Sequence, residues 1–159
     1  MIHDRSEPDI ANEFQAASAT LILASHRLLT GQALLSLPGE NDAGRALYDA
    51  CFVVLAHDIA PDPVFFYANR KAQQLFEMSW DEMVSLPSRH SAESPARSDR
   101  QRLLDQVARQ GYIDDYSGIR VSKTGKRFLI ERATVWNLMD AAGQVLGQAA
   151  AFATWIPLG

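Results

Sequence analysis

The sequence predicts an α+β fold: a five-stranded antiparallel sheet with short helices on one face and a long N-terminal helix. Two short runs rich in aromatic and β-branched residues stand close together in the first half of the chain, and three longer strand-like runs end it. Helical patterns precede the first two strands and fill the interval before the last three. Strands and helices segregated in this way are typical of α+β domains.

The segment 1–37 carries the pattern of one amphipathic helix. A helix-start signal at residues 6–9 combines a serine, a proline and two acids, and Gly31 is a suitable C-terminal cap. Between them, apolar residues recur at spacings of four and three: Ile10, Phe14, Ala17, Leu21, Ala24 and Leu28. This helix is expected to pack on the rest of the domain or on a twin.

The apolar face of this helix is wider than one packing partner usually covers, because Ile22, Leu23 and Leu29 extend it. We therefore expect a homodimer in which this face is buried between the two chains or against the partner's sheet. The residues expected there are Ile10, Phe14, Leu21 and Leu28.

The segment 43–159 is expected to form the rest of the domain. Asn69 follows a strand and can cap the next helix, and capping boxes begin at Ser79 and Ser98. The apolar alternation changes face near Glu131 and Arg132, which predicts a β-bulge there. The expected strands are 51–56, 64–67, 112–122, 127–138 and 145–155, and the expected helices are 43–49, 70–76, a short one after Ser79, and one from Ser98 to Gly111.

Length, charge and cysteine content limit the possible functions. A chain of 159 residues is one ordinary domain. The formal net charge of −4 argues against a nucleic-acid partner, because phosphate binding needs a basic face. The single cysteine, Cys51, excludes an internal disulfide and a zinc site of several cysteines. No apolar run reaches the ~18 residues of a membrane span, and no signal-peptide layout is present, so we expect a cytoplasmic protein without membrane contact.

The order of elements resembles that of a PAS domain, most sharply over residues 65–88, FFYANRKAQQLFEMSWDEMVSLPS. There an aromatic strand ends in Asn69, and two short helices follow. The chain is more closely similar to the PAS-like MEKHLA family, although the hexapeptide that names the family is absent as a literal string. The blocks that carry this resemblance are SHRLLTG, ANRKAQQLFEMSWDEMVSLPSR, YSGIRVSKTGKRFLIERATVWNL and GQAAAFATW. The resemblance implies a PAS-type sensory or dimerisation module and brings no established catalytic residues.

Two cofactors of PAS relatives, covalent flavin and haem, are not expected. Flavin-binding light sensors carry their cysteine in an Asn-Cys-Arg-Phe-Leu-Gln run that is absent here, and Cys51 is instead expected to be a buried apolar residue opening a strand. Haem needs an axial ligand, and the polar neighbours of His90 predict a solvated loop. His57 is expected to form a surface pair with Asp58, and no metal-ligand spacing occurs.

The sequence allows a small-molecule pocket between the sheet and the helices. The alanine-rich last strand leaves room there, with Phe66 and Phe76 as apolar walls. The polar strand residues able to point inward are Tyr116, Arg120, Thr134, Asn137 and Gln148. Of these, Tyr116, Asn137 and Gln148 are the expected ligand contacts. The alternative is that aromatic side chains fill this space, because protein interiors are close-packed.

We therefore predict a PAS-like regulatory module for signal sensing or for binding a protein partner. Two other functions stay open: a pure dimerisation scaffold with a closed core, and a small enzyme using the same cavity. An enzyme is not expected, because no nucleophile stands beside a general base in a recognisable motif.

Overall fold

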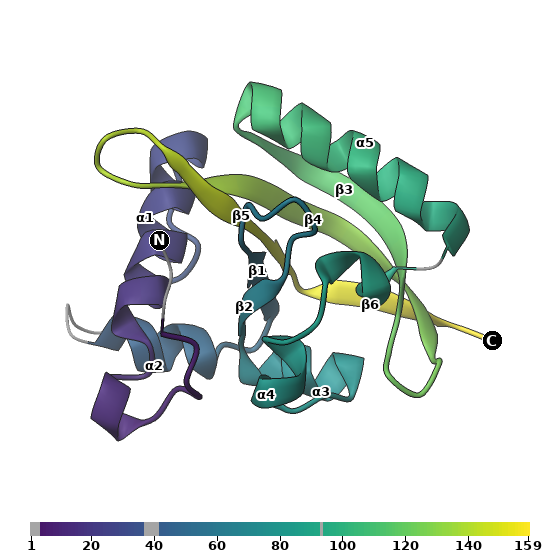
Figure 1. Cartoon of the computed structure of the whole chain (residues 1–159), viewed down its shortest axis with the longest axis horizontal. Coiled ribbons are helices and arrows are strands. Elements are labelled where there is room, and N and C mark those ends of the chain that lie inside the picture. The colour runs from purple at the N-terminus through teal and green to yellow at the C-terminus, as the bar shows by residue number, and fades with distance from the viewer. Residues whose placement is uncertain (1–3, 37–41, 93) are drawn as a thin grey trace.

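The computed structural model describes residues 4–36, 42–92 and 94–159 (Figure 1). The helices are α1 (Ala16–Thr30), α2 (Ala43–Tyr48), α3 (Arg70–Phe76), α4 (Trp80–Met83) and α5 (Ser94–Gln110), with short 3-10 turns η1 (Ile10–Asn12) and η3 (Ser88–Ser91). The strands are β1 (Val53–His57), β2 (Phe65–Ala68), β3 (Tyr112–Val121), β4 (Arg127–Met139), β5 (Val145–Phe152) and β6 (Thr154–Leu158). None of the described helices combines the length and apolarity needed to span a membrane.

The strands form one antiparallel sheet in the order β2-β1-β5-β4-β3, and β6 pairs with β4 outside this path. This arrangement confirms the predicted α+β class and the antiparallel meander of the last three strand runs. The run predicted as one strand, 145–155, divides at Ala153, so the described residues form a sixth strand. β5 lies between β1 and β4, whereas β6 pairs with β4 alone.

A bulge in β4 accounts for this division. Arg132 has a left-handed backbone with φ 51°, and the β3–β4 register shifts beside it. Thr134, on one side of the bulge, pairs with Ala151 of β5. Glu131, on the other side, pairs with Thr154 of β6. Because a bulge bends its strand and increases the twist, β6 continues along β4 without reaching β1. The predicted bulge is confirmed.

The N-terminal helix is shorter than predicted, and the side that it buries in the chain is not the predicted apolar face. α1 starts at Ala16 instead of within residues 6–9, and it ends at Gly31 as predicted. Leu28 is 71% exposed, and Ile10, which lies outside α1, is 78% exposed. Phe14 and Leu21 are half-buried and pack against the core. The side of α1 that is buried carries Ser18, Ala19, Ile22, Ser25 and His26.

The late start of α1 has a local cause and a tertiary one. Asp9 caps the turn η1 in a capping box with Asn12, instead of a long helix. Residues 13–15 then have φ between 53° and 55°, which an α-helix does not contain. Gly44 of α2 lets this segment come close, because a Cβ there would lie 2.4 Å from the Glu13 carbonyl oxygen.

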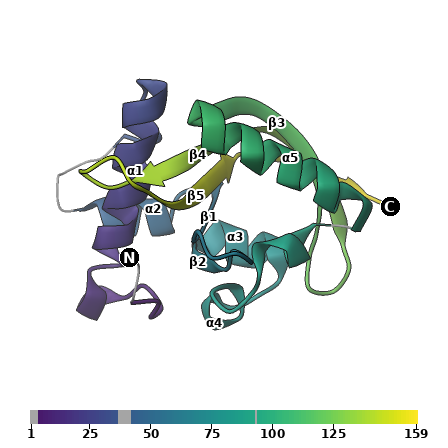
Figure 2. The same ribbon diagram turned by 45° about the horizontal axis from the view of Figure 1, so that its top comes forward.

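Helices cover both faces of the sheet (Figure 2). On the face that we call outer, Ile22 of α1 packs against Trp136 of β4, whose indole N–H donates to the Ile22 carbonyl over 3.2 Å. On the inner face, Phe76 of α3 joins one apolar cluster, and Val107 of α5 packs against Val135 in another. α5 lies along β3 on this inner side (Figure 1).

Asn69 caps α3 as predicted and also joins three elements. Its Oδ1 accepts the N–H of Ala72 in α3 and that of Val54 in β1, both over 3.1 Å. Its Nδ2 donates to the Leu47 carbonyl over 3.2 Å and to the Phe52 carbonyl over 2.8 Å. The side chain is fully buried. Asn69 therefore fixes the position of α3 relative to β1 and α2.

Two further boundaries differ from the prediction. α5 begins at Ser94, ahead of the predicted cap Ser98, because Pro95 falls in the first turn, where proline needs no N–H partner. Cys51 is exposed, not buried, because β1 starts only at Val53. The capping box of α4 is present as predicted.

Candidate functional site

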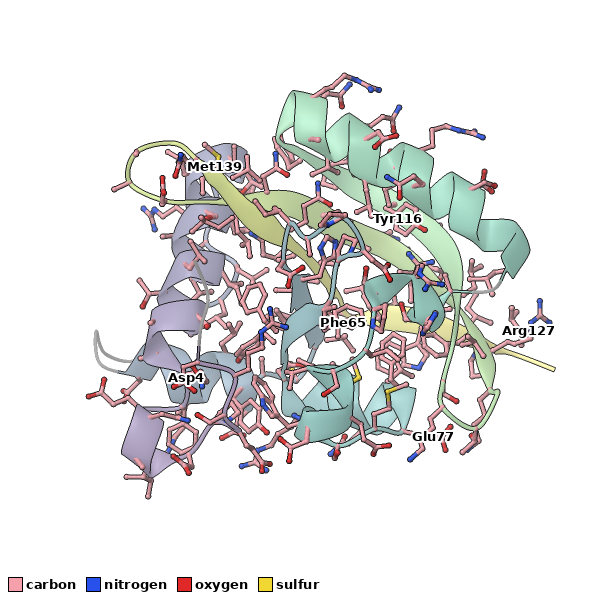
Figure 3. All side chains as sticks on the ribbon, in the orientation of Figure 1. Asp4, Phe65, Glu77, Tyr116, Arg127 and Met139 are labelled. Atoms are coloured by element: carbon pink, nitrogen blue, oxygen red, sulfur yellow. The ribbon has the colours of Figure 1, made fainter. Side chains whose placement is uncertain are left out.

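A cavity lies between the inner face of the sheet and helices α3 and α5. Its volume is about 60 Å³, and one water needs on the order of 10–15 Å³ of such space. It therefore has room for a few waters or a small ligand. Its large apolar walls are Leu55, Phe65, Phe76, Leu103, Leu104, Ile130, Val135 and Phe152, and its polar walls are His57, Ser91, Tyr116, Arg120 and Gln148. Figure 3 labels Phe65 and Tyr116.

The strand register places three polar residues side by side at one end of this site. His57 of β1 is opposite Gln148 of β5, which is opposite Asn137 of β4. Residues directly opposite each other point to the same face of a sheet. The three side chains therefore form one polar row on the inner face.

Asn137 and Gln148 form a hydrogen-bond chain with a fixed direction. Asn137 Nδ2 donates to the Val107 carbonyl over 3.0 Å, which leaves its Oδ1 as an acceptor. Gln148 Nε2 donates to that Oδ1 over 3.1 Å and to the Leu104 carbonyl over 3.2 Å. Both partners only accept, so the Gln148 amide cannot be reversed without losing both bonds. Gln148 Oε1 is buried and has no hydrogen-bond partner among the described residues.

Arg120 brings a positive charge into the cavity wall and is 8% exposed. It donates to the Tyr116 hydroxyl from Nη2 and to the Ile119 carbonyl from Nη1, each over 3.0 Å. Tyr116 reaches it by lying over Gly118, where a Cβ would stand 2.2 Å from the hydroxyl oxygen. Within the described part of the chain, no carboxylate forms an ion pair with Arg120.

The structure brings three of the five predicted pocket residues to the cavity: Phe76, Tyr116 and Gln148. Asn137 is buried behind them and meets the cavity wall through Gln148. Phe66 belongs to the outer cluster, and its neighbour Phe65 takes the inward position. Alternation along a strand places one of two adjacent residues on each face.

Sequence reasoning missed part of the wall. It named Arg120 as able to point inward but not as a ligand contact, and it did not assign Leu104 of α5 to the pocket. Thr134 was also named as able to point inward. It pairs with Ala151, which belongs to the outer cluster, so Thr134 points to the outer face. The available signal was the alternation of side chains along a strand: Arg120 lies four residues beyond Tyr116 on β3, so both point to the same face.

His57 and Asp58 do not form the predicted surface pair. β1 extends to His57, which is therefore buried and lines the cavity, with Nδ1 2.8 Å from the Asp58 carbonyl oxygen. The Asp58 carboxylate instead pairs with Arg5 over 2.7 Å. Burial acts to raise the pKa of Asp58, but the Val64 N–H and the Arg5 side chain outweigh it and lower that pKa.

The residues in this wall are suited to holding a small molecule. They offer a cation, an amide acceptor and apolar surface within one cavity. Cys51 and His90 are both exposed and lie outside the cavity wall. Over the described residues, no group of three His, Cys, Asp or Glu side chains is placed to hold a metal ion.

The sheet order and the flanking helices are those of a PAS domain. Among similar solved structures is the PAS domain of a protein from Colwellia psychrerythraea, at 13% identity and TM-score 0.60, covering 72% of this chain and 92% of that one. The blue-light photoreceptor aureochrome1 LOV domain matches at 17% identity and TM-score 0.53, covering 79% of this chain and 88% of that one. An RNA-binding light-oxygen-voltage receptor matches at 21% identity and TM-score 0.60, covering 72% of this chain but 32% of that one. These likenesses show the fold alone, and the chain is a PAS-fold module.

A family model identifies one family within this fold. The sequence model of the MEKHLA domain matches residues 16–157, from the first residue of α1 into β6. The chain belongs to the MEKHLA domain family, which confirms the resemblance carried by its sequence blocks. No curated protein matches it.

Proposed function

We propose that this MEKHLA domain is a sensory module that binds a small molecule in the cavity between the inner face of the sheet and helices α3 and α5. The observation that carries the proposal is a pair of polar groups in an otherwise largely apolar wall. Among the described residues, Gln148 Oε1 is buried without a hydrogen-bond partner, and Arg120 is buried without a carboxylate partner. An unsatisfied buried polar atom costs about 1–3 kcal/mol. A ligand that pairs with Arg120, or that holds a water donating to Gln148 Oε1, lowers that cost.

Two sets of contacts connect a ligand in this cavity to the helices at the surface of the domain. The carbonyls of Leu104 and Val107 tie α5 to Gln148 and Asn137, so a shift of these amides acts on α5. On the other face, Trp136 follows directly after the cavity residue Val135 and contacts α1. The output is then a change in how α1 or α5 meets a second copy or a protein partner.

A dimerisation scaffold with a closed core is the second candidate, favoured by the small cavity volume of about 60 Å³. Ligand binding and a closed core are distinguished by filling the cavity. Ala150 lies on its wall, and Ala150→Leu adds side-chain volume there. Ala142→Leu makes the same change in the exposed β4–β5 turn and serves as the matched control.

The experiment is a ligand-observed NMR screen of small apolar and amphipathic compounds against the wild type and both variants. We expect compounds that bind the wild type and the Ala142→Leu protein but not the Ala150→Leu protein. If no compound binds, or if binding survives Ala150→Leu, the cavity is not a ligand site and the scaffold function takes its place.

A further inference from the structure

The cavity wall carries a positive charge, Arg120, and its described residues supply no counter-charge. The guanidinium of Arg120 carries one positive charge. The described residues of the wall include no Asp or Glu. A buried charge is unfavourable unless it is paired. Within the described structure the cavity therefore offers a ligand a cation that no wall carboxylate balances.

The bonds that Arg120 already makes leave part of its binding capacity unused. A guanidinium has five N–H donors, and the bonds to the Tyr116 hydroxyl and the Ile119 carbonyl use one on each terminal nitrogen. Both acceptors are neutral, so they do not balance the charge. A guanidinium binds a carboxylate with two parallel hydrogen bonds, a stronger pairing than bonds to neutral oxygens.

The rest of the wall selects against a highly charged ligand. Phe65, Phe76 and Ile130 are large apolar residues of this wall, and one cation balances one negative charge. A volume of about 60 Å³ favours a small ligand with a short chain. We propose that the ligand is a short apolar monocarboxylic acid whose carboxylate pairs with Arg120 and whose hydrocarbon part lies against these apolar walls. This inference rests on the proposed function, that the cavity binds a small molecule.

The test is isothermal titration calorimetry of the wild-type protein with hexanoate and with hexanamide. Hexanamide has nearly the same shape as hexanoate but no charge. We expect hexanoate to bind at least about tenfold more tightly, the size of effect that a charge-assisted hydrogen bond gives. Arg120→Gln is expected to remove this preference, and Arg120→Lys to keep part of it. Arg109→Gln, at the exposed end of α5, is the control and is expected to bind like the wild type.

A chain-length series separates a free short acid from a fatty acid of lipid origin. Butyrate and hexanoate are expected to bind more tightly than decanoate, because the cavity is small. Tighter binding of decanoate overturns the proposed class of short acids.

The preference for acid over amide is measured on the wild type, so it does not depend on the stability of any variant. Equal binding of hexanoate and hexanamide overturns the inference and leaves the proposed function standing. Binding of neither compound also overturns the inference, and the compound screen with Ala150→Leu then decides the proposed function separately.

Discussion

Gln148 donates a 3.1 Å hydrogen bond to Asn137 across the β5–β4 pair, and both amides also donate to carbonyl oxygens of α5. Two strands and one helix are thus joined at a single point on the edge of the cavity. The remaining acceptor at this point, Gln148 Oε1, is buried and has no partner within the described structure. A water or ligand group that donates to this oxygen acts directly on the link between the sheet and α5.

Gln148→Leu is expected to lower the free energy of unfolding, because Asn137 Oδ1 and the Leu104 carbonyl lose their donor. The loss is about 1–3 kcal/mol, near the lower end because the unsatisfied Oε1 is removed as well. Gln144→Leu, in the exposed turn before β5, is the control and should change stability by less than about 0.5 kcal/mol. Urea unfolding measures both, and equal effects would contradict a structural role for the amide pair.

Asn69→Ala is expected to destabilise the fold far more than an ordinary cap mutation. It removes the cap of α3 and leaves the Leu47 and Phe52 carbonyls without their donor, for a total of about 3 kcal/mol or more. Ser79→Ala removes only the exposed cap of α4 and should cost about 1 kcal/mol. Thermal or chemical unfolding compares the two, and similar losses would show that the buried bonds of Asn69 carry no extra stability.

His26 is expected to make the fold less stable in mild acid. Its ring is buried against Trp136, and burial lowers its pKa below the ordinary 6.5, although the bond from Nδ1 to the Gln32 carbonyl acts to raise it. The unfolded chain therefore takes up a proton before the folded chain does. The contribution of neutral His26 to the free energy of unfolding is fully present above pH 6.5. It is lost as the pH falls from there toward the lowered pKa of the folded state.

Urea unfolding at pH 7.5 and 5.5 checks this expectation, with His26→Gln as the test and the exposed His90→Gln as control. The wild type and the His90→Gln protein should lose more stability on acidification than the His26→Gln protein. The same loss in all three proteins would assign the pH dependence to other groups.

Homodimerisation through the N-terminal segment stays a prediction. Leu28 is 71% exposed and Ile10 78% exposed, so neither is buried within its own chain. Leu28→Glu should therefore leave the unfolding of the monomer unchanged while shifting a dimer toward monomer. Arg27→Gln makes an equal change in charge on the exposed side of α1 and should leave the dimer intact. Light scattering across a concentration series decides the matter, and a wild type that is monomeric throughout would reject the dimer.

Features set by local chemistry could be predicted from the sequence. Asn69 and Ser79 cap helices where their side chains reach the first free N–H groups, and such caps depend on a few neighbouring residues. The start of α1 could not be predicted in this way. It depends on the left-handed residues 13–15 and on the close approach of Gly44, which is distant in the sequence.

The direction in which the central strands point could not be predicted either. Every residue of β1 and β2 is buried, because helices cover both faces of the sheet. Such strands lose the alternation of apolar and polar residues that identifies the inner face. For this reason Phe66 was expected at the cavity, where the structure has Phe65. Gln148 could be placed there because it interrupts an apolar strand with a polar group.

The most direct test of the ligand-binding account is the mass of the intact protein, purified from its own host and measured under native and denaturing conditions. If the cavity holds a ligand, the native spectrum shows an added mass that disappears on denaturation and is absent from the Ala150→Leu protein. Identical native and denatured masses for the wild type, after gentle purification, would contradict it.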